Sequence, residues 1–171
     1  MQQDHSTREV PLTKGYVAIV DEEDYERVCQ YKWTALVSRH TVYAYRADRS
    51  TGERRTLYLH RFLLNPPEDM EVDHIDRDGL NNTRSNLRLA TRRENMINRG
   101  MSPRNVSGYR GVSWAARDRR WLAQICVEGK TIHLGSFRDP AEAAKVYDEA
   151  AKEYHGLWAQ LNFSSESVTT G

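Results

Sequence analysis

The chain has 171 residues, which suits one ordinary domain or two small ones. Hydrophobic residues make up 39% and charged residues 29%, a balance that is typical of folded proteins and excludes an intrinsically disordered chain. The mean hydropathy is −0.78, and no apolar run approaches the length of a membrane span or a signal sequence, so we expect an intracellular protein with no membrane partner. The formal net charge is only +1, so a nucleic-acid partner would have to be bound by local clusters of cations.

The first part of the chain predicts a small unit rich in strands. Residues 1–10 are polar and are expected to fray. Strands are expected over residues 13–20, 33–36, 41–46 and 56–59. Asp21 is placed to cap a short helix that runs to about Tyr31, with Tyr25, Val28 and Cys29 on its inner side.

A second short helix should begin at Leu59-His60-Arg61 and end before Pro66-Pro67. His60 at its start could approach a phosphate or a metal, or it could have a structural role. The two cysteines, Cys29 and Cys126, are too few for a four-cysteine zinc site, and we expect both to be small core residues.

Residues 71–95 predict a strand, a turn-rich loop, a second strand and a helix. The first strand covers residues 72–75 and the second residues 86–89, separated by a loop rich in Asp, Asn and Gly. The helix should start at Thr91, because the Thr91 hydroxyl can accept from the Glu94 amide while the Glu94 carboxylate reaches back to the Thr91 amide.

Three side chains in this unit suggest a chemistry. Asp73 and His74 leave the first strand on opposite faces, and Asn95 lies one turn into the helix. Carboxylate and amide oxygens suit Mg²⁺ or Mn²⁺, and a neutral histidine beside such an ion can take a proton from an attacking water. A metal ion together with a general base is what the hydrolysis of a phosphodiester requires.

This stretch resembles the HNH nuclease motif, in the variety found in phage- and intron-encoded homing endonucleases. The matching pieces are Val-Asp-His-Ile-Asp at 72–76, Asn-Asn-x-x-Ser-Asn-Leu-Arg at 81–88 and Glu-Asn-x-x-Asn at 94–98. The resemblance implies that His74 is the general base, that Asp73 and Asn95 are metal ligands, and that Asn86 ties the loop to the second strand and orients the histidine. Arginines surround the motif and are expected to contact DNA: Arg88, Arg92, Arg93 and Arg99.

Residues 109–163 predict a second, separate unit after a linker rich in helix- and strand-breaking residues. Three strands are expected over 109–114, 121–127 and 130–137. Trp121, Ala123, Ile125 and Val127 share one face of the middle strand, and Leu122, Gln124 and Cys126 share the other. A helix capped by Asp139, with an apolar stripe of alanines and tyrosines that ends at Tyr154, should cover one face of the sheet and leave the other free for a DNA major groove.

This second unit resembles the DNA-binding domain of plant apetala/ethylene-response-factor regulators. The matching pieces are Tyr-Arg-Gly-Val at 109–112, Trp-x-Ala-x-Ile at 121–125, Leu-Gly-x-Phe at 134–137, Ala-Ala-x-x-Tyr-Asp-x-Ala-Ala at 143–151 and Gly-x-x-Ala-x-Leu-Asn-Phe at 156–163. The resemblance implies DNA contacts from Arg110, Gln124 and the loop arginines Arg117, Arg119 and Arg120. Ser113, Thr131 and His133 differ from the plant residues at other contact positions, so the plant target sequence cannot be carried over.

We therefore expect an α+β protein with an N-terminal HNH nuclease domain of the ββα-metal type and a C-terminal three-stranded antiparallel sheet packed on one helix. The expected ranges are 1–98 for the nuclease domain, 99–108 for a linker, 109–163 for the DNA-binding domain and 164–171 for a tail. The expected function is metal-dependent cleavage of double-stranded DNA by a monomer or homodimer without a small-molecule cofactor. Two alternatives remain: a non-catalytic, sequence-specific DNA-binding regulator, and a small-molecule hydrolase that uses the same metal site.

Overall fold

The computed structural model describes residues 6–38, 40–50 and 52–163. The chain divides into two compact units, residues 1–96 and residues 97–171, and each is described by itself. Among the described residues, no helix is both long enough and apolar enough to cross a membrane. The expected tail, residues 164–171, lies outside this part of the chain.

The first element that the structure describes is a strand, which corrects the expectation of fraying for residues 7–10, while residues 1–5 lie outside the described residues. β1 (Thr7–Pro11) pairs antiparallel with β2 (Val17–Asp21) along its whole length, and Val10 is almost completely buried. Residues 13–15, expected as strand, form a single 3₁₀ turn, η1 (Thr13–Gly15), that joins the two. The strand could not be predicted from its mostly polar sequence, because it is held by backbone pairing and by one buried side chain, Val10.

The helix α1 (Glu22–Cys29) follows β2, and the strands β3 (Thr34–Val37), β4 (Val42–Asp48) and β5 (Arg55–Tyr58) form an antiparallel sheet in chain order. α2 (Leu59–Leu64) follows at once and ends at Asn65, which has the left-handed backbone conformation. The Asp21 side chain makes no cap hydrogen bond to α1; its carboxylate instead accepts a hydrogen bond from the backbone N–H of Arg84.

Both cysteines are free and exposed, so the expectation that they are core residues was wrong. The core of the first unit is built from aliphatic side chains of the strands and of both helices, together with Trp33. The Trp33 indole N–H donates to the carbonyl oxygen of Val28, which satisfies the one polar group of that buried ring.

The expected strand, loop, strand and helix are present at the end of this unit. β6 (Glu71–His74) pairs antiparallel with β7 (Leu87–Ala90), and the helix α3 (Arg92–Ile97) begins after Thr91. The reciprocal cap is also confirmed. The Glu94 N–H donates to the Thr91 hydroxyl oxygen at 3.3 Å, and the Thr91 N–H donates to the Glu94 carboxylate at 2.7 Å.

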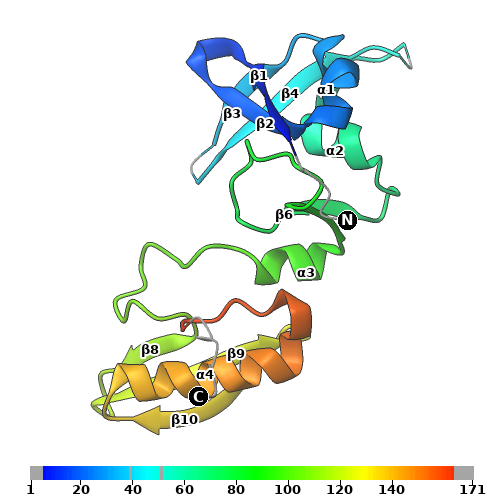
Figure 1. Cartoon of the computed structure of the whole chain (residues 1–171). Helices are drawn as coiled ribbons and strands as arrows, with labels where there is room; N and C mark the ends of the chain where they lie inside the picture. Colours follow the sequence, from blue (N-terminus) through cyan, green and yellow to red (C-terminus); the bar gives the residue numbers. More distant parts are fainter. Residues whose placement is uncertain (1–5, 39, 51, 164–171) are drawn as a thin grey trace, which may run out of the picture. The chain divides into compact units, whose positions relative to one another are not determined.

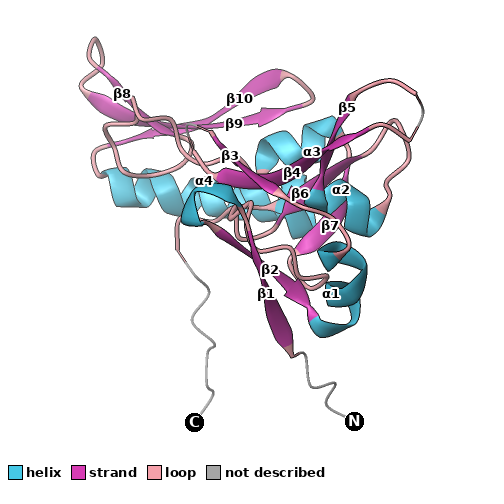
Figure 2. Ribbon diagram, turned by 90° about the horizontal axis from the view of Figure 1, so that it is seen from above, coloured by secondary structure: helices cyan, strands magenta, loops and turns pink. Residues whose placement is uncertain are grey.

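The second unit is a three-stranded antiparallel sheet with one helix along it (Figures 1 and 2). β8 (Val112–Ala115), β9 (Arg120–Val127) and β10 (Lys130–Phe137) lie in the order β10-β9-β8, and α4 (Pro140–His155) packs on one face. The Asp139 carboxylate accepts from the Glu142 N–H at 3.3 Å, as expected for its cap, and a short 3₁₀ turn, η2 (Gly156–Trp158), follows. The predicted α+β fold class is therefore confirmed.

Alanines allow α4 to lie close to the sheet. Ala143, Ala144 and Ala151 are completely buried, and Tyr147 packs with Ala151 against Ile125 of the sheet. Tyr154, expected on the same stripe, is 43% exposed. Residues 99–108 fall within the second unit, and their Asn105 side chain donates to the carbonyl oxygen of Tyr109 at 2.7 Å.

Candidate active site and nucleic-acid interface

His74 ends β6 and is buried, with 6% of its surface exposed. Its ring contacts the rings of Tyr43 in β4 and His60 in α2, with centroid distances of 5.9 and 5.0 Å. The His60 ring in turn stacks on Tyr58 at 5.4 Å. His74 is therefore held by aromatic side chains from two earlier elements of the chain, β4 and α2, a surrounding that the motif spacing alone does not reveal.

The loop between β6 and β7, residues 75–86, is held by amide side chains. Asn86 accepts from the backbone N–H of Asp76 at 3.0 Å and donates to its carboxylate at 2.8 Å, while the backbone N–H of Ile75 donates to the Asn86 carbonyl at 2.9 Å. These bonds agree with the expectation that Asn86 ties the loop to the second strand. The side chain that faces His74 Nε2, however, belongs to Asn82, whose Oδ1 lies 3.5 Å away.

Asp73 and Asn95 lie against the same face of β6. Asp73 is buried beside Arg88, its partner across the strand pair, whose Nε and Nη2 each lie 2.8 Å from Asp73 Oδ2. The Asn95 amide NH₂ donates to the carboxylate of Glu71, which shares the Asp73 face because side chains alternate along a strand. Since the NH₂ is engaged with Glu71, the carbonyl oxygen of Asn95 is turned away from that residue.

The donor set fits a hard divalent cation. One carboxylate and one amide oxygen on a common face of the strand are suitable ligands for Mg²⁺ or Mn²⁺, which keep waters and take further oxygens from a phosphate. Among the described residues, no cluster of three or more His, Cys, Asp or Glu side chains could hold a metal ion.

Burial lowers the pKa of His74 below its usual value, although the Asn82 contact and the neighbouring carboxylates of Asp76 and Asp73 oppose that shift. The imidazole is therefore neutral at neutral pH and holds a lone pair that can accept a proton. This is the protonation state that a general base requires.

His60 is more strongly affected: burial, then the charges of His74 and Arg61, lower its pKa to about 3. Its Nδ1 is buried without a hydrogen-bond partner in the part of the chain that the structure describes. The unfolded chain then takes up a proton near pH 6.5, well before the folded protein does. The contribution of neutral His60 to the free energy of unfolding is therefore fully present above about pH 6.5. It falls by roughly 1.4 kcal/mol for each pH unit between pH 6.5 and pH 3.

We expect His60→Phe to flatten this pH dependence, because phenylalanine keeps the aromatic packing and does not titrate. The measurement is the free energy of unfolding in urea between pH 7.5 and 4.5. His133→Phe, which changes an exposed histidine of the second unit, should retain the wild-type slope. An unchanged slope in His60→Phe would show that other groups set the acid sensitivity.

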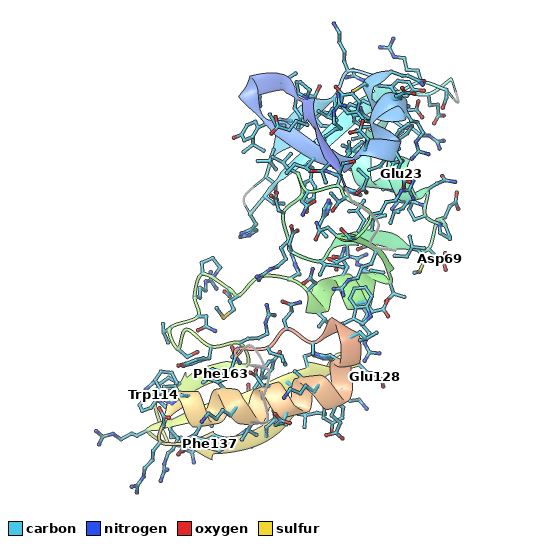
Figure 3. All side chains as sticks on the ribbon, in the orientation of Figure 1. Glu23, Asp69, Trp114, Glu128, Phe137 and Phe163 are labelled. Carbon is cyan, nitrogen blue, oxygen red and sulfur yellow. The ribbon has the colours of Figure 1, made fainter. Side chains whose placement is uncertain are left out.

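The face of the second sheet opposite α4 is polar. Strand register and alternation place Gln124 on this face, where it lies opposite His133 of β10. The same rule places Cys126 and Thr131 there. Figure 3 shows Trp114 and Phe137 at one end of this sheet and Glu128 at the other.

The arginines expected to contact DNA fall into two groups. Arg88 pairs with Asp73, and Arg110 donates a guanidinium hydrogen bond to the carbonyl oxygen of Arg99, so both have protein partners. The other arginines are exposed or partly exposed on α3, on residues 99–108 or on the β8–β9 hairpin: Arg92, Arg93, Arg99, Arg117, Arg119 and Arg120.

Comparisons with known proteins match both units. A family model described as HNH endonuclease matches residues 65–97, and one described as AP2 domain matches residues 107–157. An uncharacterized HNH endonuclease of Acanthamoeba polyphaga mimivirus is 33% identical over 155 residues, which cover 87% of this chain and 76% of the relative. Protein 3.8 of Escherichia phage T7 is 35% identical over 95 residues, covering 56% of this chain and 78% of the relative.

The AP2 match also links the second unit to plant proteins. An AP2-like ethylene-responsive transcription factor of Arabidopsis thaliana is 44% identical over 62 residues, which cover 36% of this chain and 13% of that much longer protein. Both resemblances inferred from the sequence are therefore confirmed. The chain belongs to the HNH endonuclease family and carries a C-terminal AP2 domain.

Proposed function

We propose that this protein is a metal-dependent, site-specific DNA endonuclease of the homing type. The observation that carries the proposal is the arrangement of side chains at β6. A buried, neutral His74 ends this strand, and Asp73 and the α3 residue Asn95 lie against the strand face opposite to His74. In this proposal His74 is the general base, and Asp73 and Asn95 supply two hard oxygen ligands from the other face of the same strand. The HNH endonuclease match over residues 65–97 covers all three residues and supports the same roles.

His74 would accept the proton of the attacking water as the new bond from oxygen to phosphorus forms and the bond to the leaving oxygen breaks. A divalent ion held by Asp73 and Asn95, with its remaining positions filled by water and phosphate, would stabilise the charge on the leaving oxygen. Arg88 partly neutralises Asp73 and so limits the negative charge that an approaching phosphate meets.

The AP2 domain would supply DNA recognition through the free face of β8–β10, with Gln124 reading a base edge and the hairpin arginines contacting phosphates. Arg110 would join them if its bond to Arg99 yields to a phosphate. One such active site cuts one strand, so a monomer should nick, and a double-strand break would require a homodimer or successive events.

The test is the relaxation of supercoiled plasmid by the full chain, using a plasmid library that carries candidate target sites. We expect nicked circles in Mg²⁺ or Mn²⁺, none in EDTA, and recovery of nicking when the metal is restored. DNA binding in a gel shift without cleavage in any divalent metal would overturn the proposal in favour of a DNA-binding regulator with a relic nuclease fold.

A further inference from the structure

We propose that Asn82 is a positioning residue that fixes the tautomer of His74, so that Nε2 carries the proton and Nδ1 is the atom that accepts the proton of water. The inference rests on the proposed nuclease function, in which His74 is the general base. It assigns a role to Asn82, which is neither the base nor one of the proposed metal ligands. It follows from the orientation of one buried amide.

The Asn82 side chain can present only one of its ends to His74. It is completely buried, and its NH₂ group donates to the carbonyl oxygens of Gly79 at 3.3 Å and Leu80 at 3.0 Å. Flipping the amide would place its oxygen against two carbonyl oxygens and leave both NH₂ donors without those acceptors. The atom that faces His74 Nε2 is therefore Oδ1, which only accepts hydrogen bonds.

The backbone around Asn82 is fixed by the first strands of the chain. The Asn82 N–H donates to the carbonyl oxygen of Ile19 at 2.7 Å, and the Ile19 N–H donates to the carbonyl oxygen of Leu80 at 2.8 Å. Two residues further on, the Arg84 guanidinium donates to both carboxylate oxygens of the buried Asp24, at 2.8 and 2.9 Å. Asn82 thus has a fixed position to which the His74 ring must adapt.

The His74 ring is also confined. Tyr43 and His60 contact it, and a Cβ added to Gly79 would come within 2.6 Å of the Tyr43 ring, so Tyr43 is packed directly against the same loop. A neutral imidazole carries one proton, on Nδ1 or on Nε2. With an obligate acceptor opposite Nε2, the Nε2–H tautomer gains a hydrogen bond, and the lone pair then lies on Nδ1.

The first test is direct and needs no cleavage. Long-range ¹H–¹⁵N correlation spectra of the metal-free full chain at neutral pH distinguish the two tautomers, and His74→Gln identifies the His74 signals by their loss. We expect the Nε2–H form. A spectrum dominated by the Nδ1–H form would overturn the proposal, whether or not the protein cleaves DNA.

The second test removes the acceptor. Asn82→Ala should shift the His74 signals towards a mixture of tautomers and lower the nicking rate by about 10- to 100-fold, the usual effect of losing a residue that orients a functional side chain. Asn81→Ala is the matched control: its side chain bonds to Asp76 and Thr83 rather than to His74, so the tautomer should persist.

If Asn82→Ala fails to fold, as judged by circular dichroism, the wild-type spectrum still decides which tautomer His74 adopts, and an Nδ1–H form there overturns the proposal. A wild-type tautomer signal that survives in a folded Asn82→Ala variant would contradict the role of Asn82. Absence of wild-type nicking would instead count against the proposed function and leave the tautomer result intact.

Discussion

Replacing His74 with alanine is expected to lower the rate of plasmid nicking by about 10²- to 10⁴-fold, the usual contribution of a positioned general base. The variant keeps the metal ligands and the AP2 domain, so DNA binding in a gel shift should remain close to wild type. The measurement is the initial rate of relaxation of supercoiled plasmid at saturating Mg²⁺, with the variant and the wild type at equal concentration.

The controls separate loss of chemistry from loss of fold. His74 is buried among aromatic rings, so its removal leaves a cavity and should lower the melting temperature modestly. His155→Ala changes a histidine of the second unit that contacts the Cys126 carbonyl, and should leave the rate unchanged. Relaxation by folded His74→Ala at the wild-type rate would refute the assignment of the base.

The parts of the fold that the sequence predicted well are those fixed by local signals. The β10 range, the Asp139 cap and the Thr91–Glu94 pair follow from turn residues and capping side chains close in sequence. The turn at Glu128-Gly129 has positive φ at both residues, as a tight hairpin requires. The strand β1 lacked such signals, because its partner lies beyond an intervening 3₁₀ turn and its side chains are mostly exposed.

The same distinction applies to the candidate site. Asp73, His74, Asn86 and Asn95 could be proposed from spacing, because all four lie within one strand-loop-strand-helix unit. Their neighbours could not. Tyr43 reaches His74 from a strand about 30 residues earlier, and the Asn81-Asn82 pair has the composition of an ordinary turn. Only the fold shows that one of these asparagines faces the histidine and that the other does not.

The exposure of Cys126 was predicted wrongly, because it depends on the sheet face on which the residue lies and not on the residue type. Period-two alternation already placed Cys126 on the face of β9 opposite Trp121, and that face is the one that α4 leaves uncovered. The preference of cysteine for protein cores is weaker than this geometry.

The AP2 domain depends on one glycine, and Gly111→Ala is expected to destabilise the second unit by about 2–5 kcal/mol. Gly111 has φ +73°, which disfavours any L side chain, and an added Cβ would fall 1.9 Å from the ring of Tyr147. Tyr147 cannot withdraw easily, because it is buried and packs with Ile125 of the sheet and Ala151 of its own helix. The β8 end of the sheet would have to separate from the helix, and DNA affinity should fall with the folded fraction.

The matched control for this effect is Gly108→Ala. Gly108 has φ +75°, almost the same backbone conformation, but an added Cβ would meet no atom within 4 Å. Its substitution should therefore cost only the backbone strain, about 1–2 kcal/mol. Urea unfolding followed by tryptophan fluorescence suits the comparison, because Trp114, Trp121 and Trp158 all belong to the second unit. We expect a larger loss of unfolding free energy in Gly111→Ala than in Gly108→Ala, because only the Cβ at position 111 meets the Tyr147 ring. Equal losses in the two variants would show that the Tyr147 ring moves aside at little cost.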